Sequence, residues 1–175
     1  MRVTVIETNI FPDPENTLAP LGEVKYLVIH HTGGNAEGTV DPDPDAATID
    51  GWHKNQNWAG IGYHYVIRKD GSVERGRPRD FQGSHAWGLN RNSLGIHVGG
   101  DFQNFEPTAA QQESLNNLIA DLCDIYGLDP AAAVIGHRDV AELIGNQEAA
   151  TDCPGDNMYA KIEGVKAAVA GLLNG

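Results

Sequence analysis

The sequence lacks several features that would assign it to a large functional class. No apolar run approaches the ~18 residues that a membrane-spanning helix requires, so no membrane segment is expected. Positive charge is scarce, because 12 Lys and Arg stand against 24 Asp and Glu, for a net charge of −12. Nucleic-acid binding depends on clustered Lys and Arg, so this balance argues against a nucleic-acid partner. It also disfavours simple electrostatic adhesion to an anionic surface, so an anionic substrate would have to be recognised in a cleft.

Cysteine is also scarce, and its two copies occupy different settings. A disulfide framework is not indicated. Cys123 falls in an expected amphipathic helix and is interpreted as a buried thiol, whereas Cys153 lies in a polar loop beside proline. The apolar stretch at the N-terminus is short and is broken by Glu7, so no secretory signal is expected.

No internal repeat, low-complexity tract or linker interrupts the 175 residues, which favours one domain. Residue patterns predict strands at 24–31, 61–68, 73–76, 94–98 and 131–135, and helices at 46–56, 108–127 and 159–173. Asp70-Gly71 predicts a hairpin turn, and Thr108 with Gln111 has the spacing of a capping box. We therefore expect an α/β fold, a single domain over residues 24–175 with a central mixed β-sheet flanked by helices. Residues 1–23 are expected to form an N-terminal arm packed on that domain.

Three residues have the chemistry of a metal site. His30 and His137 each end an apolar run, and Cys153 follows His137 by 16 residues in a separate loop. Two imidazoles and a thiolate are zinc ligands, and three protein ligands leave one position of a tetrahedral ion open. A single histidine more often has a structural role, so the hypothesis rests on the three residues together. His31 points to the opposite face of its strand from His30 and is interpreted either as a group that supports the ligands or as a structural residue.

Taken together, seven short motifs in order carry a family resemblance. They are Val28-Ile29-His30-His31-Thr32, Trp52-His53, Gly62-Tyr63-His64, Gly83-Ser84-His85-Ala86, Asn92-Ser93-Leu94-Gly95-Ile96, Gly136-His137-Arg138-Asp139 and Thr151-Asp152-Cys153-Pro154-Gly155. This pattern resembles the zinc-dependent N-acetylmuramoyl-L-alanine amidases of type 2, the family of phage lysozyme-type amidases and animal peptidoglycan-recognition proteins. The resemblance covers residues 24–173.

The resemblance implies a zinc cleft on one face of the sheet. One Zn²⁺ ion would be bound by His30, His137 and Cys153, with Asp152 as an alternative oxygen ligand. Such an ion lowers the pKa of its bound water towards ~7, which makes a nucleophile available at neutral pH.

The resemblance also implies roles for residues around the ion. Tyr63 and Thr151 would act in catalysis by hydrogen-bonding the oxyanion or the attacking water. Thr151 stands where phage members carry lysine, so it brings a hydrogen bond without a charge. His85, Trp87 and Asn90 would contact substrate in the groove. Trp52 is expected in the core, and Trp58 is left open between core and groove.

The function implied is a peptidoglycan hydrolase that cleaves the amide between the lactyl group of N-acetylmuramic acid and L-alanine. The expected setting is a phage or prophage endolysin, a monomer made in the cytoplasm that reaches the cell wall after release. Its partner would be peptidoglycan or a muropeptide, with no nucleic acid and no membrane. The alternatives are a cytoplasmic amidase that recycles muropeptides and a non-catalytic peptidoglycan-binding module. A structural zinc protein is disfavoured because no fourth ligand has suitable spacing.

Overall fold

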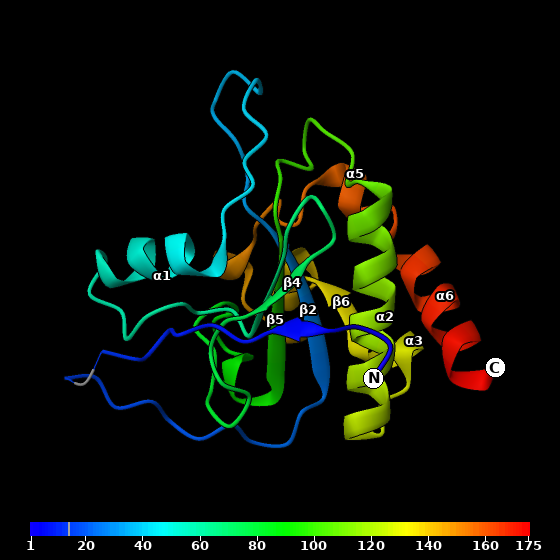
Figure 1. Cartoon of the computed structure of the whole chain (residues 1–175), viewed down its shortest axis with the longest axis horizontal. Helices are drawn as coiled ribbons and strands as arrows, with labels where there is room; N and C mark the ends of the chain where they lie inside the picture. Colours follow the sequence, from blue (N-terminus) through cyan, green and yellow to red (C-terminus); the bar gives the residue numbers. More distant parts are fainter. Residues whose placement is uncertain (14) are drawn as a thin grey trace.

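The computed structural model describes residues 1–13 and 15–175. Within these residues, six strands form one mixed sheet in the order β1-β4-β3-β5-β2-β6 (Figure 1). The strands are β1 (Val5–Ile6), β2 (Tyr26–His31), β3 (Tyr65–Ile67), β4 (Val73–Arg75), β5 (Ser93–Val98) and β6 (Val134–Gly136). β3 and β4 form the antiparallel hairpin that Asp70-Gly71 predicts, and the other neighbouring strands pair in parallel. The expected α/β fold with a central mixed sheet is confirmed.

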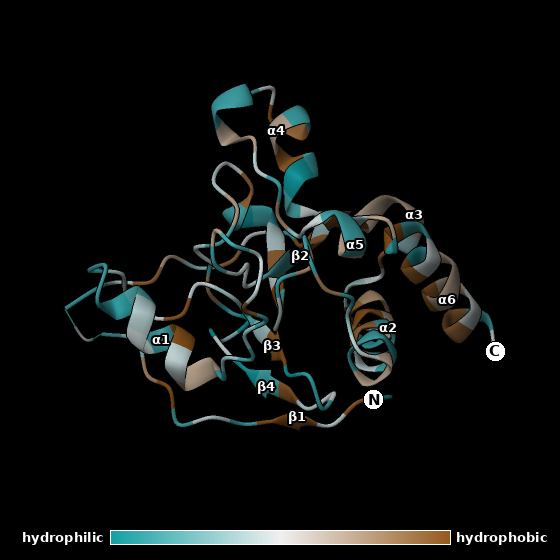
Figure 2. Cartoon of the chain, turned by 90° about the horizontal axis from the view of Figure 1, so that it is seen from above, coloured by the Kyte–Doolittle hydropathy of each residue, from teal (hydrophilic) through white to brown (hydrophobic). Residues whose placement is uncertain are grey.

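Helices cover the sheet on two sides. They are α1 (Ala46–Lys54), α2 (Ala109–Tyr126), α3 (Pro130–Ala133), α4 (Val140–Leu143), α5 (Asp156–Tyr159) and α6 (Ile162–Asn174). Short 3₁₀ turns occur at Asn90–Asn92, His137–Asp139 and Gln147–Ala149. Seen from above, α2, α3 and α6 lie to one side, α1 lies to the other, and α4 stands out from the body (Figure 2). None of the described helices combines the length and apolar character needed to cross a bilayer.

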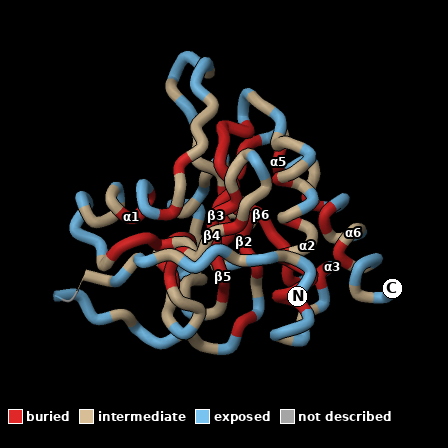
Figure 3. Tube along the Cα trace, viewed as in Figure 1, coloured by how far each residue is buried: buried red, intermediate tan, exposed pale blue. Residues whose placement is uncertain are grey.

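Side-chain alternation along the central strands separates the core from the functional face. Leu27 and Ile29 of β2, together with Ile96 of β5, belong to the main core, which α2 and α6 complete. Val28 and His30 of β2 alternate with them and point to the opposite face. Buried chain concentrates in the central strands (Figure 3). A residue's position along β2 therefore decides whether it packs under the helices or faces the other side.

The long helix α2 begins and ends as its sequence predicts. The Thr108 hydroxyl accepts from Gln111 N at 3.0 Å, and the Gln111 side chain accepts from Thr108 N, which completes the capping box. Gly127 follows with φ +65°, the left-handed conformation that ends helices. Cys123 is buried on this helix with 2% exposure, as expected.

Four expectations need correction. The strand expected at 131–135 begins only at Val134, because Asp129 caps a helical turn in which Pro130 is the first residue. The strand expected at 61–68 is regular only from Tyr65 to Ile67. The C-terminal helix is interrupted, since α5 ends at Tyr159 and α6 begins at Ile162. Trp52 was expected in the core, but its side chain lies on the outward face of α1 with 45% exposure.

Candidate metal centre and cleft

Two neighbouring parallel strands bring the first two candidate ligands together. In the pairing of β2 with β6, Ile29 lies opposite Gly136, so the two strands end at the same edge of the sheet. His30 follows Ile29, and His137 follows Gly136. Cys153 enters from the loop that precedes α5. Residues that are far apart in sequence therefore meet at one edge.

The three side chains form a compact donor group. The ligand atoms of His30, His137 and Cys153 all lie within 4.8 Å of one another. Cys153 Sγ is 3.7 Å from His30 Nδ1. Two ligands bound tetrahedrally to zinc at ~2.1 Å and ~2.3 Å would lie about 3.6 Å apart, so the observed spacing fits such an ion. The carboxylate of Asp152 is not part of this group, which can hold a metal ion through its two nitrogens and one sulfur.

Burial controls the protonation states of the donors. It lowers the pKa of His137 and lowers that of His30 well below its usual value, and the nearby His85 and His137 lower the pKa of His30 further. Both imidazoles are therefore neutral near pH 7. Burial also raises the pKa of the Cys153 thiol to about 12, although the His31 backbone N–H and Arg138 act in the opposite direction. The site thus presents two ready nitrogen donors and one thiol that must lose its proton.

A second histidine orients the first. His30 Nε2 lies 2.9 Å from His85 Nδ1, which leaves His30 Nδ1 facing Cys153. The His85 ring packs on Gly95 of β5, where an added Cβ would come within 2.5 Å of it, so only glycine fits there. Hydrogen bonds to the far nitrogen of a ligand histidine fix its orientation and strengthen metal binding. His85 is thus a positioning group as well as a cleft residue.

The loop that carries Cys153 is fixed through its backbone. Arg138 N donates to Cys153 O at 2.8 Å, and the Arg138 guanidinium donates to Asp152 O. The hydroxyl of Thr151 accepts from Cys153 N at 3.2 Å. Because that hydroxyl is used as an acceptor, its own proton remains available for donation.

Tyr63 is surrounded by histidine rings. Its ring centroid is 5.0 Å from that of His30 and 5.0 Å from that of His97. Burial raises its pKa above the usual value, so the phenol keeps its proton and can act as a donor. The next residue, His64, turns away and accepts from Gly95 N at 3.0 Å. Of these two alternating residues, Tyr63 is the one that faces the cleft.

A cleft of about 530 Å³ opens beside the metal centre. Three of the sequence-predicted groove residues, His85, Trp87 and Asn90, line it, together with Tyr63 and His137. Asn90 Oδ1 accepts from the backbone N–H groups of His85 and Ala86 at 2.9 Å each, so it shapes the cleft wall. Thr151 is not among the residues that line the cleft, and its hydroxyl lies next to the Cys153 backbone.

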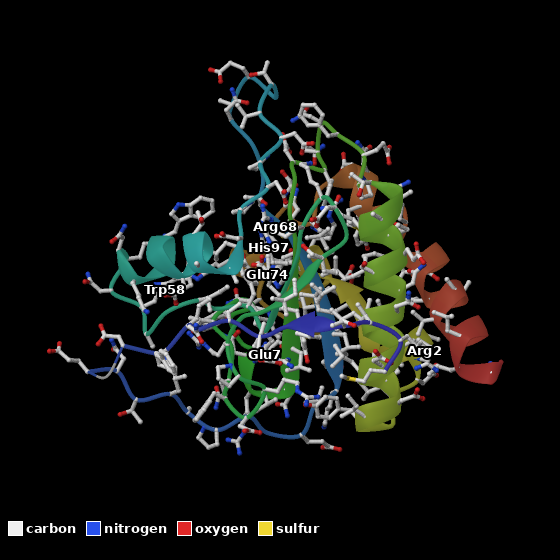
Figure 4. All side chains as sticks on the ribbon, in the orientation of Figure 1. Arg2, Glu7, Trp58, Arg68, Glu74 and His97 are labelled. Atoms are coloured by element: carbon white, nitrogen blue, oxygen red, sulfur yellow. The ribbon has the colours of Figure 1, made fainter. Side chains whose placement is uncertain are left out.

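Two further cleft residues were not singled out as site residues by the sequence. His53 and Trp58 line the cleft, with their ring centroids 4.5 Å apart. His53 Nδ1 accepts from Gly62 N at 2.9 Å, which turns its other nitrogen outward. Trp58 lies just beyond α1 (Figure 4). The sequence signal that could have identified His53 was the Trp52-His53 motif. Of these two neighbours, Trp52 is exposed and His53 faces the cleft.

Comparison with known proteins gives a family match. A family model described as N-acetylmuramoyl-L-alanine amidase matches residues 20–156. An endolysin of Enterobacteria phage K11 is 40% identical over 97 residues, covering 51% of this chain and 61% of the phage protein. Peptidoglycan-recognition protein SC2 of Drosophila melanogaster is 32% identical over 141 residues, covering 79% of this chain and 72% of the fly protein. The match therefore spans about three fifths of the length of the phage relative.

The fold agrees with that assignment. N-acetylmuramoyl-L-alanine amidase LysC from Clostridium intestinale superimposes with a TM-score of 0.78 at 34% identity. The match covers 95% of this chain and 97% of the clostridial one.

Proposed function

The chain belongs to the N-acetylmuramoyl-L-alanine amidase family, and on this premise we propose that it hydrolyses the amide between muramic acid and L-alanine in peptidoglycan. The observation that carries the proposal is the His30–His137–Cys153 donor group beside a cleft of about 530 Å³. Three protein donors leave a position open at a tetrahedral ion, as a catalytic site requires. Zinc bound there would supply Lewis acidity and an activated water near neutral pH.

The chain's own residues hold and polarise the substrate. The Tyr63 phenol, protonated at neutral pH, donates a hydrogen bond to the oxygen that develops negative charge on the scissile carbonyl. Thr151 accepts from the Cys153 N–H and so positions that loop, and its own hydroxyl proton is the second neutral donor that we assign to the oxyanion or the attacking water. Trp87 and Asn90 shape the substrate side of the cleft. His85 keeps His30 oriented throughout the reaction.

The setting we propose is a phage-type endolysin that acts on the intact cell wall after its synthesis in the cytoplasm. The similarity to phage endolysins supports this setting over muropeptide recycling. The peptidoglycan-recognition relatives keep a non-catalytic binding module as the competing function. Since a pure binding module does not need a three-donor metal group, that group favours the enzyme.

The test compares zinc-loaded protein, chelator-treated protein and Cys153→Ala on purified sacculi. We expect new L-alanine amino termini without new reducing sugar ends, and loss of this release on chelation or in the variant. Cys123→Ala is the matched control, because that thiol is buried on α2 away from the donor group, and its release should match wild type. Zinc binding to wild type without new amino termini would leave a binding module.

A further inference from the structure

A second, smaller pocket continues from the cleft past Trp87. It encloses about 230 Å³ and is lined by Trp87, Asn146, Glu148 and Ala149. Trp87 and Ala149 also line the main cleft, so the two cavities share a wall. Asn146, Glu148 and Ala149 all come from the segment that joins His137 to Cys153. The same stretch of chain thus connects two candidate ligands and builds the second pocket.

The wall of this pocket is packed in place. Ile144 lies over Gly88, which has φ +83° and where an added Cβ would come within 2.8 Å of the Ile144 side chain. Val140, at the start of α4, is buried against Val28 and Ala86. Because apolar contacts hold the segment to the rim of the sheet, its polar side chains are presented in fixed positions.

The backbone of the wall is already hydrogen-bonded within the segment. Asn146 N donates to Ala141 O at 2.9 Å, and Ala149 N donates to Asn146 O at 3.2 Å. Recognition of an extended peptide relies on main-chain groups that are open for pairing. This wall offers side chains instead, which disfavours a peptide strand as its occupant.

Those side chains suit a sugar ring. Trp87 is 68% exposed and presents a broad apolar surface. Asn146 Oδ1 accepts from Glu148 N at 3.0 Å, so the amide NH₂ of Asn146 is its remaining donor. The exposed Glu148 carboxylate forms no ion pair with the described residues and is an acceptor. A pyranose offers an apolar C–H face together with hydroxyls that both donate and accept.

We propose that this pocket binds the N-acetylated sugar adjacent to the reacting muramic acid, so that the enzyme recognises the glycan strand as well as the amide. The proposal rests on the proposed amidase function. The volume of the second pocket is below the ~300–1,000 Å³ of a site that holds a whole ligand, so the pocket suits a single sugar ring next to the main cleft. The muramoyl amide then lies at the metal centre while the neighbouring sugar lies on Trp87.

The test holds the stem peptide constant and varies the glycan. Substrates are the muramoyl peptide with one sugar and the same peptide on the disaccharide. We expect wild type to have the higher kcat/KM on the disaccharide substrate. Asn146→Asp, which loses its N–H donors, and Glu148→Gln, whose acceptor becomes uncharged, should each lower kcat/KM about 3- to 10-fold on the disaccharide substrate, the effect of one lost or weakened hydrogen bond, and leave the one-sugar substrate within twofold. Asn146→Asp keeps the oxygen that accepts from Glu148 N.

Glu142→Gln is the matched control, since it removes the same charge from the same segment without lining the pocket. Equal kcat/KM on both substrates, with no effect of the pocket variants, would overturn the sugar pocket and leave the amidase standing. A further set of substrates carries longer stem peptides on the same sugar. Sensitivity of Glu148→Gln to peptide length instead of sugar number would overturn the proposal in favour of a peptide pocket.

Failure of the amidase function has a different signature, because wild type would then cleave neither substrate. Binding of the disaccharide peptide, measured by quenching of tryptophan fluorescence, then tests whether the pocket binds the sugar. Weaker binding in Glu148→Gln, with Glu142→Gln like wild type, would support the sugar pocket. Identical binding by all three proteins, or none, would overturn it.

Discussion

Burial is the main influence on the charged state of single residues at the metal centre. It keeps His30 and His137 neutral, Tyr63 protonated, and the Cys153 thiol protonated before a metal binds. Each of these states has a consequence for binding or catalysis. The His85 contact adds orientation, since it leaves one defined nitrogen of His30 to face the sulfur.

The first residue-scale prediction concerns protons released by zinc. Binding at pH 7.5 should release one proton from Cys153, whose pKa is raised to about 12, and up to one more from the zinc-bound water, whose pKa falls towards ~7, whereas His30 and His137 are already neutral. Calorimetry in buffers of different ionisation enthalpy measures the number. Release of more than two protons would show that the ligand histidines are charged in the metal-free protein.

The second residue-scale prediction is for Tyr63→Phe. Removing the phenol should lower kcat by roughly 10²- to 10³-fold, as for the loss of one donor to a developing oxyanion, and leave zinc content unchanged. The ring would still pack beside His30 and His97. Rates on sacculi together with metal analysis check it, and full activity of the variant would contradict the role of the hydroxyl.

At the scale of elements, the candidate metal centre is formed by the ends of β2 and β6 and by the loop before α5. The helix α2 anchors the beginning of the chain. The buried Asp121 carboxylate of α2 accepts from Arg2 N at 2.8 Å and from Val3 N at 3.1 Å. Figure 4 shows Arg2 beside α2. Just beyond it, β1 joins the sheet by parallel pairing with β4. One helix thus contributes to the core and also holds Arg2 and Val3, next to β1.

The element-scale prediction compares two aspartates that contact the same arginine. Asp121→Ala should lower the free energy of unfolding by about 1–3 kcal/mol, because the part-buried N–H groups of Arg2 and Val3 lose their charged acceptor. Asp124→Ala is the control, since its exposed ion pair with Arg2 should contribute little. Urea denaturation of both variants measures the difference. Equal effects would mean that the backbone contacts of Arg2 and Val3 do not contribute to stability.

For the whole molecule, the buried histidines set the response to acid. Burial lowers the pKa of His64 to about 4 and that of His97 to about 3. Below pH ~6.5 the unfolded chain binds protons that these folded side chains do not, so stability falls as pH falls. Most carboxylates titrate at lower pH, which isolates the histidine effect between pH 6.5 and 5.

The whole-molecule prediction follows from this loss of stability at lower pH. For the metal-free protein, the free energy of unfolding should decrease from pH 7.5 to 5.5 by roughly 1 kcal/mol for each of His64 and His97. Urea titrations in the presence of chelator at the two pH values measure it. An unchanged free energy of unfolding would show that these rings take up protons in the folded state.

How far the sequence predicts the structure differs between elements. The apolar run ending at His30, the hairpin at Asp70-Gly71 and the Thr108 cap were all predicted, because each depends on a local pattern. The strand start at Val134 was missed, since Asp129 and Pro130 first favour a helical turn. The outward position of Trp52 was missed because an apolar residue on a short helix does not reveal which face is covered.

The family and the α/β fold were predicted from the sequence alone, because the order of the motifs and the periodicity of the apolar runs are properties of the sequence. Both predictions are confirmed. Other features exist only in three dimensions. The contact between His85 and His30 joins residues 55 positions apart, and the pocket between Trp87 and Glu148 depends on Ile144 packing over Gly88. Such features are set by how distant segments pack against each other, which no local pattern specifies.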